Sequence, residues 1–129
     1  MKEVDDLGIV GIRDPNTKEE RVLFKAINSV SLEWYVLINT KLIREGGINI
    51  LNDHVFWFPS GITVKEGEFI RVYTVKAGEY KKEQSKYGKE DAIFHDFFWG
   101  LRKPIWDMVT SDALTVLHIK KWNTAGSSQ

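Results

Sequence analysis

Three histidines, His54, His95 and His118, are the strongest candidates for metal ligation or general-base chemistry in this sequence. None of them lies in a metal-binding spacing such as HExxH. His95 and Asp96 are neighbours in a predicted strand, where consecutive side chains point to opposite faces, so we do not expect them to form one site. His118 alternates with apolar residues, which indicates a partly buried structural histidine. The histidines therefore predict no metal site.

Carboxylates and serines give no stronger signal for catalysis. Asp107 and Asp112 flank a predicted turn, where a carboxylate commonly accepts hydrogen bonds from backbone amides. Ser60 and Ser111 lack the G-x-S-x-G elbow of a nucleophilic serine. The glycines form neither a dinucleotide-binding motif nor a P-loop. We predict no catalytic residue, no cofactor and no metal, so an enzyme with an unrecognised site is the least favoured hypothesis.

A basic tract with two tyrosines is the first candidate for binding a partner. It comprises Tyr80, Lys81, Lys82, Lys86, Tyr87 and Lys89. Cationic side chains beside stackable rings suit a phosphate backbone with exposed bases. The alternative is a solvated hairpin tip whose lysines maintain solubility. The tract is therefore a candidate nucleic-acid site, although the solvated tip is favoured.

An aromatic cluster with a basic pair is the second candidate for binding a partner. It comprises Phe97, Phe98, Trp99, Arg102, Lys103 and Trp106. Aromatic residues and arginine are enriched at the hot spots of protein interfaces. The same rings could instead fill one end of a β-sandwich, and this role is favoured for most of them. Rings that the core cannot hide are predicted to contact a protein partner or a second copy of the chain.

These candidates must be positioned by β-strands, because helical periodicity is almost absent. Short runs rich in β-branched and aromatic residues recur at intervals of roughly ten residues between turn residues, which is typical of an all-β sandwich or barrel. We predict strands at residues 7–12, 21–27, 32–38, 48–51, 54–58, 68–74, 92–99 and 113–122. The polar segment 77–91 is predicted to be a long connection.

The centre of the sequence shows how turns and strands alternate. Pro59 and Gly61 predict a tight turn, and Gly67 is predicted to adopt a positive φ in the next one. In the strand that follows, Ile70 and Val72 alternate with aromatic and charged residues. We therefore expect a strand with an aliphatic face toward the core and a partly wet face on the other side.

Three segments resemble the lamin-tail domain, an immunoglobulin-like β-sandwich: EWYVLIN (33–39), INILNDHVFWFPSGITVKEGEFIRVYT (48–74) and FFWGLRKPIWDMVTSDALTVLHI (97–119). The shared motifs are a Glu-aromatic strand ending in Asn, a Phe-Pro-x-Gly turn, a Gly-Glu pair opening the next strand, and a Trp before a turn with Asp. They fall at Glu33 with Asn39, Phe58-Pro59-Ser60-Gly61, Gly67-Glu68, Trp106 and Asp112. The resemblance covers roughly residues 20 to 120.

Two positions depart from the family pattern. Val36 stands where a second acid usually follows, and Ser111 stands where a Gly often precedes the late Asp. The resemblance implies an immunoglobulin-like two-sheet β-sandwich of about seven to nine strands. It also implies a non-catalytic binding or targeting module, because the family has no catalytic residues and associates with proteins, nucleic acids and membranes.

Composition sets the outer limits of these expectations. A chain of 129 residues with 43% hydrophobic residues suffices for one compact domain. The 18 basic and 18 acidic residues cancel, so no overall field attracts the chain to nucleic acid or anionic membranes. The absence of cysteine excludes disulfides and zinc-thiolate sites. The acidic N-terminus lacks the apolar region of a secretory signal, so we predict a cytoplasmic protein without membrane insertion.

The sequence divides into three predicted parts. Residues 1–19 are expected to supply a first strand and turn, residues 20–122 the lamin-tail-like sandwich, and residues 123–129 a disordered tail. The favoured function is a non-catalytic interaction module that binds a protein partner or associates with itself. The alternative is a nucleic-acid-binding module that uses residues 80–89.

Overall fold

The computed structural model describes residues 1–42, 48–106 and 112–126, and these residues form strands and no helix. The strands are β1 (Lys2–Val4), β2 (Leu7–Arg13), β3 (Arg21–Ala26), β4 (Val30–Ser31), β5 (Tyr35–Leu42), β6 (Ile48–Trp57), β7 (Thr63–Val64), β8 (Phe69–Tyr73), β9 (Lys81–Tyr87), β10 (Glu90–Phe98) and β11 (Asp112–His118). Within this part of the chain, six strands form a larger sheet and three form a smaller one, and β4 pairs with β7 as a separate two-stranded sheet. The prediction of an all-β sandwich is confirmed.

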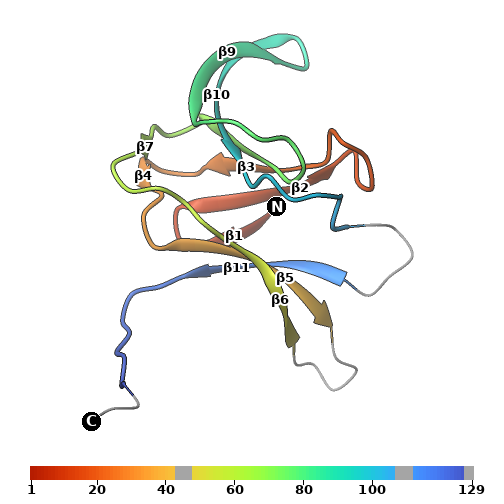
Figure 1. The fold of residues 1–129 in the computed structure, drawn as a ribbon. Helices are drawn as coiled ribbons and strands as arrows, with labels where there is room; N and C mark the ends of the chain where they lie inside the picture. The colour runs from red at the N-terminus through yellow and green to blue at the C-terminus, as the bar shows by residue number, and fades with distance from the viewer. Residues whose placement is uncertain (43–47, 107–111, 127–129) are drawn as a thin grey trace.

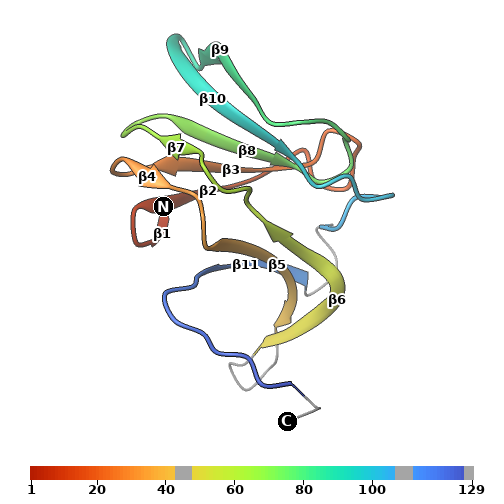
Figure 2. The same cartoon turned by 60° about the vertical axis from the view of Figure 1, so that its left-hand side comes forward.

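The larger sheet has the order β1-β2-β3-β8-β10-β9. Its neighbours are antiparallel except for β8 and β10, which run parallel. Residues 94–98 of β10 pair with β8, whereas residues 90–93 pair with β9 alone. The hairpin of β9 and β10 therefore extends beyond the rest of the sheet, as Figures 1 and 2 show.

The smaller sheet is antiparallel, with β5 between β11 and β6. It faces the larger sheet as a second layer, and the C-terminal segment curves below it in Figure 2. β11 and β5 pair over seven positions, from Asp112 opposite Lys41 to His118 opposite Tyr35. Along β5, Tyr35 and Leu37 belong to the core cluster between the sheets, and Val36 and Ile38 point to the other side, because side chains alternate along a strand.

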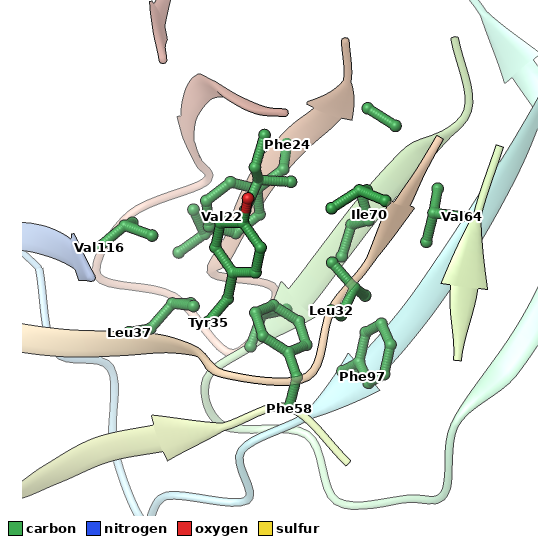
Figure 3. Packing of buried hydrophobic residues seen from close by; sticks show 14 of the residues in the cluster. Val22, Phe24, Leu32, Tyr35, Leu37, Phe58, Val64, Ile70, Phe97 and Val116 are labelled. Carbon is green, nitrogen blue, oxygen red and sulfur yellow. The ribbon is translucent and has the colours of Figure 1, made fainter. Parts of the chain in front are cut away.

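The core fills the space between the two sheets (Figure 3). Its fully buried side chains include Val22 and Phe24 of β3, Ile70 and Val72 of β8, and Leu37 of β5. Burying one side chain of this size stabilises the fold by about 1.5 to 3 kcal/mol. The prediction that Ile70 and Val72 face the core is confirmed, and Gly67 has the predicted positive φ of 84°.

Several predicted strand limits are wrong. The polar segment 77–91 is not a connection, because β9 lies within it and pairs along its length with β10. Residues 48–57 form one strand instead of two. The strand predicted from residue 32 begins at Tyr35, after a turn in which Trp34 has a φ of 75°. The last strand ends at His118, since the chain then leaves the sheet.

The predicted parts of the chain combine as follows. Residues 1–19 contribute β1 and β2 to the larger sheet, and residues 123–126 are exposed and form no strand. Residues 127–129 of the predicted tail lie outside the described residues, as do Asp107 and Ser111. The backbone of His54 lies in β6 and that of Asp112 lies in β11, and the structure describes neither side chain.

Candidate functional site: an exposed tryptophan face

The basic tract does not form one binding surface. Register places Lys81 on the same side of the sheet as Asp96, and Lys82 on the side of His95, so the lysines divide between the two faces of β9. The Tyr87 ring packs against Phe69 on one face, and the Tyr80 hydroxyl hydrogen-bonds to His95 on the other. Lys86 forms an ion pair with Asp91 and Lys89 lies at the hairpin tip. The expectation of one lysine and tyrosine surface is wrong in this respect.

The aromatic cluster predicted as a contact surface lies mainly in the core. Phe97 and Trp106 are buried, so they have the core-filling role that the sequence favoured for most of these rings, and the alternative role as contact residues is wrong for both. Phe97 packs against Phe58 with ring centroids 4.9 Å apart, and Trp99 is half-buried against Trp106 at 6.2 Å. Phe98 is half-buried and stacks on Tyr73. Of the predicted set, only Arg102 and Lys103 are exposed.

Buried Glu20 holds the backbone at Ile105 and Trp106, the last part of this cluster. Its Oε1 accepts hydrogen bonds from the Thr74 hydroxyl and the Ile105 amide, both at 2.8 Å. Its Oε2 accepts from the Asn16 amide at 2.8 Å and the Trp106 amide at 3.1 Å. Four donors therefore satisfy a carboxylate that would be costly to bury alone. No sequence pattern predicts this role, because a Glu within a charged run usually lies at the surface.

The three histidines do not converge on one site. His95 is buried, and its ring nitrogens lie 2.7 Å from the Tyr80 hydroxyl and 2.8 Å from Glu68 Oε1. Asp96 lies on the opposite face and forms a two-point ion pair with Arg71, at 2.6 and 2.8 Å. The prediction that His95 and Asp96 cannot share a site is confirmed. No metal-binding group of His, Asp and Glu occurs among the described residues.

The Tyr80, His95 and Glu68 chain resembles a nucleophile, base and orienting group in its hydrogen bonding alone. Burial raises the pKa of Tyr80, and the nearby Glu68 carboxylate raises it further, so the phenol is held protonated. Burial favours a higher pKa for Glu68, but hydrogen bonds from His95 and the Lys65 amide outweigh it and lower that pKa. The two hydrogen bonds of His95 connect β10 to the segment before β9 and to the residue that precedes β8.

His118 has the partly buried, structural position that the sequence predicts. Its ring stacks on Tyr35 at 4.0 Å, and its Nδ1 lies 2.6 Å from Asp5 Oδ2. Hydrogen bonds from His118 and Lys120 lower the pKa of Asp5. These contacts connect the turn after β1 to the end of β11, so they join the two sheets.

The outer side of the smaller sheet carries the largest exposed rings. Val36 and Ile38 of β5 point outward, and their register partners on β6 are Trp57 and Val55. Leu117 of β11 is the other register partner of Val36. Trp57 is 54% exposed, and both Val55 and Leu117 are also exposed. The outward side chains of these three strands therefore form an apolar layer with no covering sheet among the described residues.

Two further tryptophans extend this layer. Trp34 is 40% exposed and Trp122 is 61% exposed, and their rings lie 4.4 Å apart. The Ile119 amide donates a hydrogen bond to the Trp34 carbonyl at 2.8 Å, which holds the C-terminal segment beside the turn before β5. We call the surface formed by Trp34, Val55, Trp57, Leu117 and Trp122 the tryptophan face.

The tryptophan face is large and its five side chains carry no charge, while Lys120 and Lys121 adjoin Trp122 in the sequence. Since a whole aromatic side chain can bury up to about 250 Å², its three tryptophans expose roughly 400 Å² together. A patch of this area is in the range of the largest apolar patches on monomers, which are often functional. The outward residues 36, 38 and 40 of β5, 55 and 57 of β6, and 113, 115 and 117 of β11 carry no charge.

The sequence contained a signal for this surface. The run from Tyr35 to Ile38 is apolar on both faces of its strand. Strands that are covered on both sides have such continuous apolar runs, whereas a strand with one wet face alternates. The run therefore predicts a second covered face, which the alternation-based prediction did not take into account.

No family model matches this chain, and no curated protein or solved structure matches it either. The resemblance to the lamin-tail domain stays a prediction from the sequence motifs. No helix in the described part of the chain is long and apolar enough to cross a bilayer.

Proposed function

We propose that this protein is a non-catalytic interaction module that associates with a second copy of itself through the tryptophan face. The observation that carries the proposal is the exposure of three tryptophans, of which Trp57 lies on β6 and Trp34 and Trp122 contact each other beside the start of β5. Tryptophan is the residue type most characteristic of interface hot spots. The sequence resemblance to lamin-tail domains supports a binding role without catalysis.

Charge favours a second copy as the occupant. An uncharged apolar patch is complementary to itself, because it has no sign that the partner must match, and a two-fold dimer brings identical patches together. The net charge of the chain is zero, so two copies experience no overall repulsion. The tryptophans alone would supply about half of the roughly 800 Å² that each partner buries in a standard interface.

The packing of β5 gives a second reason for a partner. Leu37 on its inner face lies in the core cluster, while Val36 and Ile38 on its outer face are buried outside that cluster. A second copy placed against Trp57 and Leu117 would cover the side chains that remain exposed on either side of Val36. Burial of each large side chain would then stabilise the complex by about 1.5 to 3 kcal/mol before association costs.

Sedimentation velocity over a concentration series tests the proposal. We expect wild-type protein to form dimers within a concentration series that reaches about 100 μM. Trp57→Gln should raise the dimer dissociation constant by about thirtyfold, as for a hot-spot tryptophan. Tyr87→Gln is the matched control, since Tyr87 is an exposed aromatic residue on β9, and it should leave dimerisation unchanged.

Tryptophan fluorescence provides a second measurement. Dimerisation should shift the emission of the wild-type protein to shorter wavelength as concentration rises, because exposed indoles become buried. A wild-type protein that remains monomeric throughout the series would refute self-association. Dimerisation that Trp57→Gln and Tyr87→Gln weaken equally would refute the tryptophan face as the interface.

A further inference from the structure

Strand β9 is an open edge of the larger sheet. All seven of its residues are exposed, and β10 is its only neighbour in the described structure. Residues 90–93 of β10 pair with β9 and not with β8, so this part of the hairpin extends beyond the paired strands of the sheet (Figures 1 and 2), although the Tyr87 ring still contacts Phe69. An edge of this kind presents unpaired backbone donors and acceptors to a potential additional strand.

Lysines outnumber acids on β9 itself, with Lys81, Lys82 and Lys86 against Glu83, while Glu79 and Glu90 flank the strand. Glu83 pairs with Arg71 at 3.1 Å, and Lys86 pairs with Asp91 at 2.6 Å. Lys81 and Lys82 form no ion pair within 4.0 Å of a described acid, and Lys82 acts on Glu68 only at longer range. Since Lys81 and Lys82 are consecutive on a strand, they place one cation on each face of the sheet.

We propose that the β9 edge binds an extended acidic segment of another protein, which adds to the larger sheet as a further strand. Backbone hydrogen bonds to β9 would supply affinity, as in other cases of strand addition, and the lysines would select the sequence. Because Lys81 and Lys82 lie on opposite faces, the segment that fits best carries two consecutive acidic residues. Two acids separated by one residue would both lie on a single face.

The same lysines disfavour a second copy at this edge. An antiparallel pairing of two β9 strands centred on Gln84 would place Lys82 opposite Lys86 twice. Like charges directly opposite one another destabilise a strand pair. Lysines on an edge are a common means of preventing such pairing, and here they repel an identical strand while attracting an acidic one.

The arrangement also favours a peptide over nucleic acid. The Tyr87 ring is in contact with Phe69 at 4.4 Å, and the Tyr80 ring packs on Phe97 at 5.0 Å. Stacking of bases along a strand requires free ring faces on one surface. The two tyrosines instead lie on opposite sides of the hairpin, so backbone pairing at the edge is the better supported mode.

Fluorescence anisotropy with labelled peptides tests this proposal. The probe is Val-Thr-Val-Glu-Glu-Val-Thr-Val, and the controls replace its Glu-Glu by Lys-Lys or separate the two acids by one residue. A fourth peptide keeps Glu-Glu and carries N-methyl groups on alternate amides, which removes backbone donors. We expect binding of the first peptide, weaker binding of the separated pair, and no binding of the lysine and N-methylated peptides.

Variants of the protein complete the test. Lys81→Gln/Lys82→Gln should weaken binding of the Glu-Glu peptide by roughly three- to thirtyfold, the range for two exposed ion pairs. The matched control is Lys120→Gln/Lys121→Gln, an exposed lysine pair outside β9, which should leave binding unchanged. Circular dichroism would verify that both double variants fold.

Three results would overturn the proposal. The first is the absence of Glu-Glu peptide binding at low salt. The second is equal binding of the N-methylated peptide, which would indicate charge attraction without strand pairing. The third is binding of an oligothymidine probe while the acidic peptide does not bind, which would assign the lysines to nucleic acid. The Trp57→Gln variant should bind the peptide as wild type does, so the outcome is independent of the tryptophan face.

Discussion

Replacing Glu20 by Gln should destabilise the fold far more than an isosteric substitution usually does. Each carboxylate oxygen of Glu20 accepts from at least one backbone amide, those of Ile105 on one side and of Asn16 and Trp106 on the other. The amide group of Gln has one acceptor and one donor. Either orientation of this group therefore directs an N–H donor against a backbone N–H.

The less costly orientation places the new NH₂ group beside Thr74 and Ile105. The Thr74 hydroxyl can rotate to accept, so one backbone amide, that of Ile105, loses its partner. Loss of one charge-assisted hydrogen bond with a buried donor left unpaired costs about 2 to 3 kcal/mol. For a domain of this size, the melting temperature should fall by roughly 6 to 10 °C.

Urea unfolding followed by tryptophan fluorescence would measure this difference. Glu19→Gln is the matched control, because the Glu19 carboxylate is exposed and pairs only with Lys76 at the surface. We expect this control to change the free energy of unfolding by less than about 0.5 kcal/mol. Equal effects of the two substitutions would refute the assignment of Glu20 as the anchor of the segment before Trp106.

Two further predictions concern the hydrogen-bonded chain of buried His95. The folded-state pKa of Glu68 is below its ordinary value of 4.5, so its stabilising effect is present above that pH and is lost as pH falls through the folded pKa. When the pH falls from about 6 to 3, the free energy of unfolding of Glu68→Gln should therefore decrease less than that of wild type. Urea titrations at each pH would measure both, and parallel plots of unfolding free energy against pH for the two proteins would contradict this prediction. Tyr80→Phe should cost about 1 to 2 kcal/mol because it leaves a buried ring nitrogen of His95 without its donor. The control Tyr87→Phe should lower the free energy of unfolding by less than about 0.5 kcal/mol. Equal losses of stability for the two variants in thermal melts would argue against a stabilising Tyr80–His95 hydrogen bond.

The strands that could be predicted are those whose side chains alternate toward one core. The run from Phe69 to Tyr73 has this pattern, and its aliphatic residues lie where the pattern places them. β9 could not be predicted in this way, because all its side chains are exposed and no apolar period marks it. Its strand structure comes from the backbone hydrogen bonds of β10, which local composition does not record.

The candidate surfaces were harder to predict than the fold. Trp99 and Trp106 pack together, whereas Trp57 is exposed, although Trp57 and Trp99 both occur in aromatic runs. The face on which Trp57 falls depends on the register of β6 with β5, and the position of Trp106 depends on the hydrogen bond between its amide and Glu20. The basic tract was correctly recognised as exposed, but its division between two faces follows only from the pairing of β9 with β10.

The pairing of β11 with β5 also constrains the order in which the molecule can assemble. The Thr40 hydroxyl donates a hydrogen bond to the Ala113 carbonyl, 73 positions later in the chain. During synthesis, β5 must therefore wait for β11 to leave the ribosome, with one of its edges open in the meantime. Closing so long a loop is slow, so the smaller sheet should be completed late, and nascent chains should depend most on chaperones just before that step.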